Sequence, residues 1–147
     1  MFKSESSKES QGAKPDPVLQ ALIAHASSEN DISALWLYGS RARGDDHANS
    51  DYDLAVLFSN RLSDPFEARV RPEVRALKWA ETLALPENTL SVVDIALCPI
   101  PLGISVLQEG QLMIDKDPSN RFREESRILS RWEIDYLYHQ QRFGGIE

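Results

Sequence analysis

Two short apolar runs, each next to residues of special chemistry, constrain the fold of this chain most strongly. Residues 35–38 (Leu-Trp-Leu-Tyr) lead directly into Gly39 and Ser40, a pattern typical of a buried strand that ends in a tight turn before a helix. Residues 51–58 (DYDLAVLF) then alternate as a second strand would. We therefore expect a sheet whose strands are connected through turns and helices.

The turn after the first run has the residues of a phosphate-binding loop. Backbone N–H groups at such a turn can hold phosphate oxygens, and Gly39 would let the main chain approach a ligand closely. The hydroxyl of Ser40 can contact a phosphate or a metal and can also cap the next helix. Arg41 and Arg43 could neutralise a triphosphate, or they could pair with the acids at 45–46.

The second run carries two carboxylates, Asp51 and Asp53. Because side chains alternate along a strand, both should lie on one face with Cα atoms roughly 7 Å apart, whereas Tyr52 should face the other way and pack. Two carboxylates ~5 Å apart repel by about 3 kcal/mol at an effective dielectric of ~20. Since Mg²⁺ binds through carboxylates plus substrate phosphates, this pair predicts a metal site for a nucleoside triphosphate.

A third acid, Asp94, lies in a later strand-like run, residues 90–97. Alternation places it on the otherwise apolar face of Leu90, Val92 and Ala96, where an unpaired carboxylate is unfavourable and should meet a cation, a proton or a donor. If this strand lies beside the Asp51–Asp53 strand, three acids could hold two metals roughly 3.5–4 Å apart. Asp94 could also take the proton from an attacking hydroxyl.

These residues resemble a known family. Gly39-Ser40, ten intervening residues and then Asp51-Tyr52-Asp53 resemble the signature of the DNA polymerase β-like nucleotidyltransferases. The fuller form at residues 50–54 is similar to the minimal nucleotidyltransferases, or MNT proteins. The resemblance spans about residues 17–115 and implies an α+β fold: a mixed β-sheet flanked by helices, with an additional C-terminal helix.

The resemblance also implies a function. It implies a Mg²⁺-dependent enzyme with two metal ions that moves AMP from ATP onto a hydroxyl. Asp51 and Asp53 would hold both ions, Asp94 would hold the catalytic ion and assist deprotonation, and Gly39 with Ser40 would cradle the triphosphate. The MNT family implies a partner, a HEPN-domain toxin that is a small helical ribonuclease, which the antitoxin silences by attaching AMP to a tyrosine.

Two other functions stay open. The chain could be an antitoxin that neutralises its toxin by binding alone, with a vestigial site. It could instead be a free-standing enzyme that modifies a small-molecule hydroxyl such as that of an aminoglycoside, although larger relatives use an additional helical domain for such acceptors. Both alternatives can be separated from AMP transfer to a protein by experiment.

Composition excludes some classes of protein. The net charge of −7 argues against general nucleic-acid binding, which needs surplus Lys and Arg to neutralise phosphates. No apolar run approaches the roughly 18 residues that a membrane span needs. Cys98 is the only cysteine, so no internal disulfide can form, which favours the reducing cytoplasm.

We expect a single domain over residues 15–147, after a disordered tail over residues 1–14 that is rich in Ser, Lys and Glu. Aspartate–proline pairs predict helix starts at residues 16–17, 64–65 and 117–118. The last of these helices should span about 118–143. It carries a narrow apolar stripe that either packs on its own domain or docks a partner: Phe122, Leu129, Trp132, Tyr136 and Phe143.

Overall fold

One mixed four-stranded sheet forms the centre of the molecule. The structure, a computed structural model, describes residues 16–45 and 50–143. The strands are β1 (Ile32–Tyr38), β2 (Tyr52–Phe58), β3 (Leu90–Asp94) and β4 (Gln111–Asp115), in the spatial order β3-β2-β1-β4. β1 pairs antiparallel with β2 and with β4, whereas β2 and β3 run parallel. The mixed sheet expected from the sequence is confirmed.

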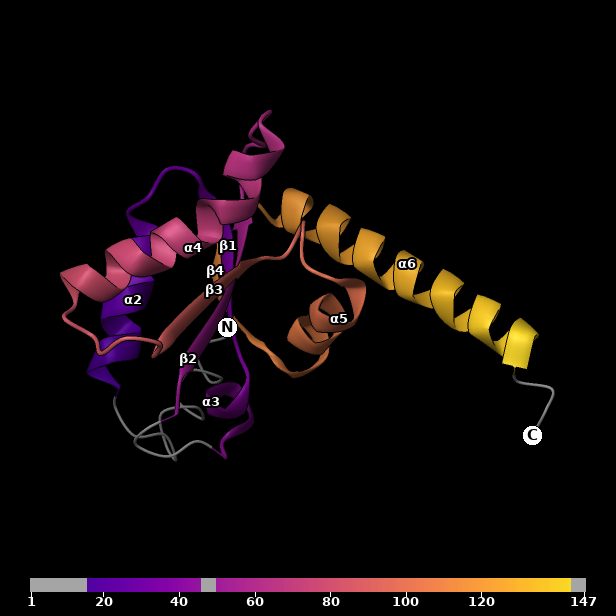
Figure 1. Ribbon diagram of the computed structural model, residues 1–147, viewed down its shortest axis with the longest axis horizontal. Helices are drawn as coiled ribbons and strands as arrows, with labels where there is room; N and C mark the ends of the chain where they lie inside the picture. The colour runs from indigo at the N-terminus through magenta and orange to yellow at the C-terminus, as the bar shows by residue number, and fades with distance from the viewer. Residues whose placement is uncertain (1–15, 46–49, 144–147) are drawn as a thin grey trace.

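Helices cover both faces of this sheet. In the described residues they are α2 (Pro17–Ser27), α3 (Ser40–Arg43), α4 (Pro65–Thr82), α5 (Ile100–Glu109) and α6 (Pro118–Phe143). Figure 1 shows the sheet edge-on, with α2 and α4 on one side and α5 and α6 on the other. The helices therefore enclose the sheet between two layers, as the α+β expectation required.

The central strand β2 shows how the sequence produces two cores. Leu54 and Val56 point into a cluster with α2 and α4, while Ala55 and Leu57 point into a second cluster with α5 and α6. Side chains alternate between faces along a strand, so a strand covered on both sides is apolar at nearly every position. This explains the continuous apolar run that follows Asp53.

Aspartate–proline pairs begin the long helices as expected. The carboxylate of Asp16 accepts a hydrogen bond from the backbone N–H of Leu19 at 3.1 Å, and that of Asp64 accepts from Phe66 at 3.1 Å. Each bond satisfies a helix N–H that has no partner inside the helix. Some strand boundaries differ: β1 begins at Ile32, before the expected run 35–38, and β2 begins at Tyr52. In addition, β3 ends at Asp94 instead of reaching residue 97, and α5 begins at Ile100, so the intervening turn is short.

A charged cluster attaches α4 to the loop before β1. Asp31 accepts hydrogen bonds from Arg71 and Arg75, each with a contact of 2.9 Å. Arg75 also donates to Glu29 at 2.6 Å, and the indole N–H of Trp79 donates to the same carboxylate at 3.1 Å. The hydrogen bond from Arg75 is the main cause of the low pKa of Asp31, about 2. These bonds fix α4 against one end of the sheet.

The C-terminal helix α6 packs only along its first half. Ile128 is fully buried against Gly103 of α5. Phe122, Trp132 and Tyr136 of the apolar stripe are 67%, 38% and 54% exposed, and Figure 1 shows the second half of α6 extending away from the sheet. Of the two readings of the stripe, packing on its own domain is therefore wrong for these residues.

Two further expectations concern the N-terminal tail and membrane-spanning segments. The predicted disordered tail over residues 1–14 lies outside the described residues. None of the helices that the structure describes has the length and apolar character needed to cross a membrane.

Candidate active site

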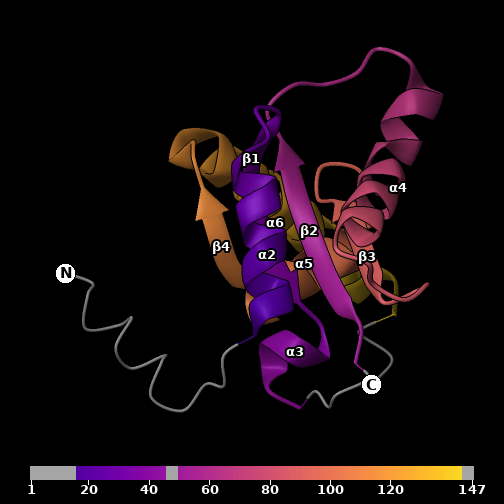
Figure 2. The same ribbon diagram turned by 90° about the vertical axis from the view of Figure 1, so that its left-hand side faces the viewer.

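The turn after β1 meets the start of β2 at one end of the sheet, where Figure 2 shows the short helix α3. Gly39 forms this turn with φ 78° and ψ −159°, a backbone conformation that is essentially restricted to glycine. A Cβ atom at position 39 would lie 2.3 Å from Oδ2 of Asp53. Glycine is required here because the Asp53 carboxylate lies directly against the main chain.

The two predicted metal ligands lie together at this turn. Asp51 immediately precedes β2 and is exposed, whereas Asp53 lies inside β2 and is half-buried. The pKa of Asp53 is raised, first because burial disfavours its charge and second because the Asp51 carboxylate is close; the positive charge of Arg43 partly offsets this. The two carboxylates are thus close enough to interact, and their joint binding of a metal ion stays a prediction.

This pair fits a divalent cation. A buried carboxylate that is further destabilised by a second carboxylate gains most from a positive charge placed between the two. Oxygen ligands of this kind suit Mg²⁺, which commonly binds proteins through one or two carboxylates and completes its shell with water and phosphate. In residues 16–45 and 50–143 no group of three or more potential ligands (His, Cys, Asp or Glu) is assembled.

Asp94 does not join this pair. The parallel register aligns Asp53 with Ser91 and Val56 with Asp94, so Asp94 lies three residues further along, or about 10 Å at ~3.3 Å per residue. Three residues is also an odd number, which places Asp94 on the face opposite to Asp53. The strands are adjacent as we expected, but the expectation that Asp94 completes a three-carboxylate site with Asp51 and Asp53 is wrong.

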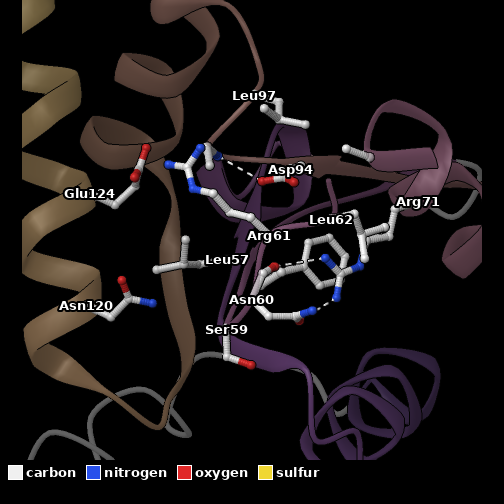
Figure 3. Close-up of a pocket in the computed structure, with 13 residues that line it drawn as sticks. Leu57, Ser59, Asn60, Arg61, Leu62, Arg71, Asp94, Leu97, Asn120 and Glu124 are labelled. Carbon is white, nitrogen blue, oxygen red and sulfur yellow. Dashed lines mark hydrogen bonds between the residues drawn. The ribbon is translucent and has the colours of Figure 1, made fainter. Parts of the chain in front are cut away.

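Asp94 instead lines a separate small cavity at the other end of β2 (Figure 3). Its Oδ1 accepts a hydrogen bond from the backbone N–H of Ala96 at 2.9 Å, so it has the donor that a buried carboxylate needs. The cavity measures about 170 Å³ and also receives Arg61, Arg71 and Glu124. Burial raises the pKa of Asp94, and the two arginines oppose this rise. The hydrogen bond from Ala96 holds the Asp94 carboxylate against the turn that follows β3.

Arg41 contacts the residues on either side of Asp51. Its guanidinium donates to the backbone carbonyl of Ser50 at 2.8 and 3.2 Å and lies over the ring of Tyr52, 3.9 Å from its centroid. It also approaches Asp16 at 3.6 Å, and Tyr52 donates its own hydroxyl hydrogen to that carboxylate at 3.0 Å. Tyr52 packs on the face opposite to Asp53, as the sequence predicted. Arg41 therefore holds the chain before Asp51 in place, and its contact with a nucleotide stays a prediction.

Arg43 lies on the open side of the same turn. It is half-exposed and contacts Asp45 at 3.4 Å and Glu109 at 3.5 Å, so the pairing alternative is what the structure shows. Its positive charge is nevertheless close enough to Asp53 to lower the pKa of that carboxyl. Arg43 and Ser40, which directly follows Gly39, thus remain next to the carboxylate pair, and their contact with a nucleotide stays a prediction.

Two residues that the sequence did not single out flank Asp53. Tyr38 on β1 and Ser91 on β3 are its register partners on the two neighbouring strands. The pKa of Tyr38 is raised to about 12, mainly by burial and then by the charge of Asp53, while a hydrogen bond with Ser91 acts in the opposite direction. Only the strand register places them beside Asp53, because both residues are far from Asp53 in the sequence.

Comparison with known proteins identifies the family. The model of the family described as polymerase beta, nucleotidyltransferase matches residues 20–119, which include both halves of the site. The protein adenylyltransferase MntA of Aphanizomenon flos-aquae (strain 2012/KM1/D3) is 27% identical over 111 residues, which cover 70% of this chain and 71% of the relative.

Solved structures share the fold at low sequence identity. A toxin–antitoxin crystal structure with AMP-PNP contains a chain that is 22% identical, with a TM-score of 0.63 and coverage of 88% of this chain and 94% of the other. A complex of a tri-AMPylated Shewanella oneidensis HEPN toxin with an MNT antitoxin contains a chain that is 18% identical, with a TM-score of 0.57 and coverage of 88% and 92%. By its family match over most of its length and its fold, this chain belongs to the polymerase β nucleotidyltransferase family.

Proposed function

We propose that this protein is an antitoxin that transfers AMP from ATP to a hydroxyl, that of a tyrosine, on a HEPN-domain ribonuclease toxin. The relative of known activity is a protein adenylyltransferase, and the structural neighbours include a tri-AMPylated HEPN toxin bound to an MNT antitoxin. The AMP-PNP complex of another neighbour supports an adenine nucleotide as donor. The single cysteine, Cys98, supports action in the cytoplasm.

The observation that carries this proposal is the contact between Gly39 and Asp53. It joins the turn that would receive the triphosphate to the carboxylates that would hold Mg²⁺, and a Cβ atom at position 39 would displace the Asp53 carboxylate from its present position. This contact supports a single site made of both parts of the motif.

The proposed reaction is a single displacement. The acceptor oxygen forms a bond to the α-phosphorus, the bond from that phosphorus to pyrophosphate breaks, and the hydroxyl proton is released to water. Mg²⁺ would neutralise charge on the triphosphate and on the leaving pyrophosphate. Asp51 and Asp53 would hold the ion, Gly39 and Ser40 would position phosphate oxygens, and Arg43 would add positive charge at the open side, so that catalysis depends on positioning and electrostatics.

A transfer assay tests this proposal. Purified protein is incubated with Mg²⁺, ATP labelled at the α-phosphate and the purified product of the neighbouring gene, which the proposal expects to be a HEPN protein, and the label on that product and its ribonuclease activity are followed. We expect labelling and loss of ribonuclease activity, with Asp51→Asn reducing the label by about 100-fold or more, as loss of a main electrostatic contact does.

The same assay separates the alternatives. Loss of ribonuclease activity without label, unchanged in Asp51→Asn, would contradict AMP transfer and support neutralisation by binding. Label on an aminoglycoside in the absence of any HEPN protein would support the small-molecule enzyme instead. The unfavourable position of Asp53 beside Asp51 argues against neutralisation by binding alone, which does not need it. The small-molecule alternative would use the same carboxylates, so the acceptor in this assay distinguishes it.

A further inference from the structure

Asp51, the exposed member of the carboxylate pair, lies just outside the sheet. The strand β2 begins at Tyr52, which pairs with Leu90 on β3, and the next residue, Asp53, pairs with Tyr38 on β1. Asp53 is therefore held between two strands, whereas Asp51 precedes the first paired residue of β2. A metal ligand must be placed accurately, because a displacement of about 1 Å at a reactive site can cost about 100-fold in rate. Contacts other than strand pairing must therefore fix the position of Asp51.

Arg41 holds the peptide group that leads into Asp51. Its Nη2 and Nε both donate to the backbone carbonyl oxygen of Ser50, at 2.8 and 3.2 Å. That carbonyl and the backbone nitrogen of Asp51 belong to one planar peptide group, so two bonds to the oxygen also fix where Asp51 begins. Hydrogen bonds from an ionised donor are stronger than those between neutral groups. Arg41 therefore supplies a support that the sheet does not.

The guanidinium of Arg41 is itself held on two other sides. The side chain is only 12% exposed, and it lies 3.9 Å from the centroid of the Tyr52 ring. Its Nη1 approaches the carboxylate of Asp16 at 3.6 Å, and the hydroxyl of Tyr52 donates to that carboxylate at 3.0 Å. Asp16 also caps α2 by accepting from the N–H of Leu19. Because α2, α3 and β2 all contribute to this network, the arginine has a fixed position from which to hold the next segment.

A second arginine makes the same set of contacts at the other end of β2. Arg71 donates to the backbone carbonyl of Asn60 at 3.0 Å and lies 3.8 Å from the centroid of the Phe58 ring. It also contacts the carboxylate of Asp31 at 2.9 Å, and its side chain is 10% exposed (Figure 3). Arg41 and Arg71 therefore match in burial and in kind of contact, but only the first holds a carbonyl that directly precedes a residue of the carboxylate pair.

Building on the proposed function, in which Asp51 and Asp53 hold the metal ion, we infer that Arg41 is a positioning residue that acts through the carbonyl of Ser50 to place the Asp51 carboxylate for metal binding. The charge of Arg41 has the opposite effect, because a positive charge near a cation site disfavours the bound cation. Removing Arg41 would strengthen metal binding if its charge alone mattered, and would weaken it if positioning matters. The two roles therefore predict changes of opposite sign.

Titration of the nucleotide-free protein with Mn²⁺, followed by the electron paramagnetic resonance signal of the free ion, measures this change. We expect Arg41→Gln to raise the Kd for Mn²⁺ about 10-fold or more, as loss of a partner that orients a metal ligand does. Arg41→Lys keeps the charge without the planar fork, so its Kd should lie between those of the wild type and Arg41→Gln. Asp51→Asn, which removes the ligand itself, should raise the Kd at least as far as Arg41→Gln.

Arg71→Gln is the matched control, because it removes the same kinds of contact at the end of β2 away from the carboxylate pair. It should leave the Kd for Mn²⁺ unchanged, while thermal melts in EDTA show which variants fold and how much stability each loses. A merely structural arginine would lower the Tm in both variants without changing the Kd in either.

An unchanged or lower Kd in folded Arg41→Gln would overturn the inference, and so would an equal rise in folded Arg71→Gln. If Arg41→Gln does not fold, an unchanged Kd in Arg41→Lys would overturn it in the same way. A wild type that binds no Mn²⁺ would overturn both the inference and the proposed metal site. The expected Kd values in a protein that transfers no AMP would uphold the inference and remove the proposed function.

Discussion

At the scale of single residues, the site combines a turn that requires glycine with an unfavourable charge. Gly39 adopts a conformation that other residues rarely reach, and Asp53 is held half-buried beside the carboxylate of Asp51. An unfavourable charge of this kind destabilises a folded chain and persists where function needs it. Both should therefore respond to substitution in ways that separate activity from stability.

Gly39→Ala should disable the site, because the new methyl group would collide with the Asp53 carboxylate and the backbone would be strained. We expect at least a tenfold loss of AMP transfer and a destabilisation of about 1–3 kcal/mol. Gly44→Ala is the control: Gly44 also has positive φ, 85°, but a Cβ there meets nothing within 4 Å. Urea denaturation should show a smaller destabilisation for Gly44→Ala than for Gly39→Ala, and the transfer assay should show loss of activity in Gly39→Ala alone. Equal activities would contradict the steric argument.

Asp53→Asn should stabilise the metal-free protein while abolishing transfer. Because the folded-state pKa of Asp53 is raised above its unfolded value, its ionisation opposes folding, fully above the folded pKa and not at all below the unfolded value near 3.8. Melts in EDTA should therefore show a higher Tm than wild type at pH 7, with the difference vanishing at acidic pH.

Adding Mg²⁺ should reverse this order, since only the wild type gains stability from the bound ion. An Asp53→Asn variant that is less stable than wild type in EDTA at pH 7 would show that the carboxylate is a structural partner instead.

At the scale of elements, the local sequence predicts most of the helices and strands. The aspartate–proline pairs at 16–17 and 64–65 cap the helices they were expected to begin, and the run 51–58 forms a strand. These features depend on neighbours within a few residues. By contrast, Arg41 contacts Asp16, which precedes it in the chain, and Ser50 and Tyr52, which follow it. Only the folded chain brings these residues together, so the contacts of Arg41 could not be predicted from its local sequence.

The two halves of α6 should differ in their contribution to stability. Ile128 is fully buried, so Ile128→Ala should destabilise the isolated protein by about 2–4 kcal/mol. Leu137 on the extended half is 59% exposed, and Leu137→Ala should change stability by less than about 0.5 kcal/mol. Chemical denaturation measures both. Equal, large effects would mean that the second half of α6 packs against the chain in solution, whereas the predicted contrast leaves that half available to a partner.

At the scale of the whole molecule, the sheet keeps Asp94 apart from Asp51 and Asp53, which the sequence had grouped into one site. Asp51 and Asp53 lie at the end of the sheet beside α3, whereas Asp94 lies in the cavity at the far end of β2. The closeness of Gly39 to Asp53 could be predicted, because both residues belong to one sequence motif with a fixed spacing between its two parts. The position of Asp94 could not, since a shift of one residue in strand register reverses the face on which a side chain lies.

The central claim is that AMP transfer takes place at Asp51 and Asp53 and does not involve Asp94. Intact-mass spectrometry of the HEPN partner tests it most directly, after incubation with ATP, Mg²⁺ and either wild-type protein, Asp53→Asn or Asp94→Asn. We predict a gain of whole AMP units with the wild type and with folded Asp94→Asn, and no gain with Asp53→Asn. A gain with Asp53→Asn, or its loss in a folded Asp94→Asn variant, would contradict this account.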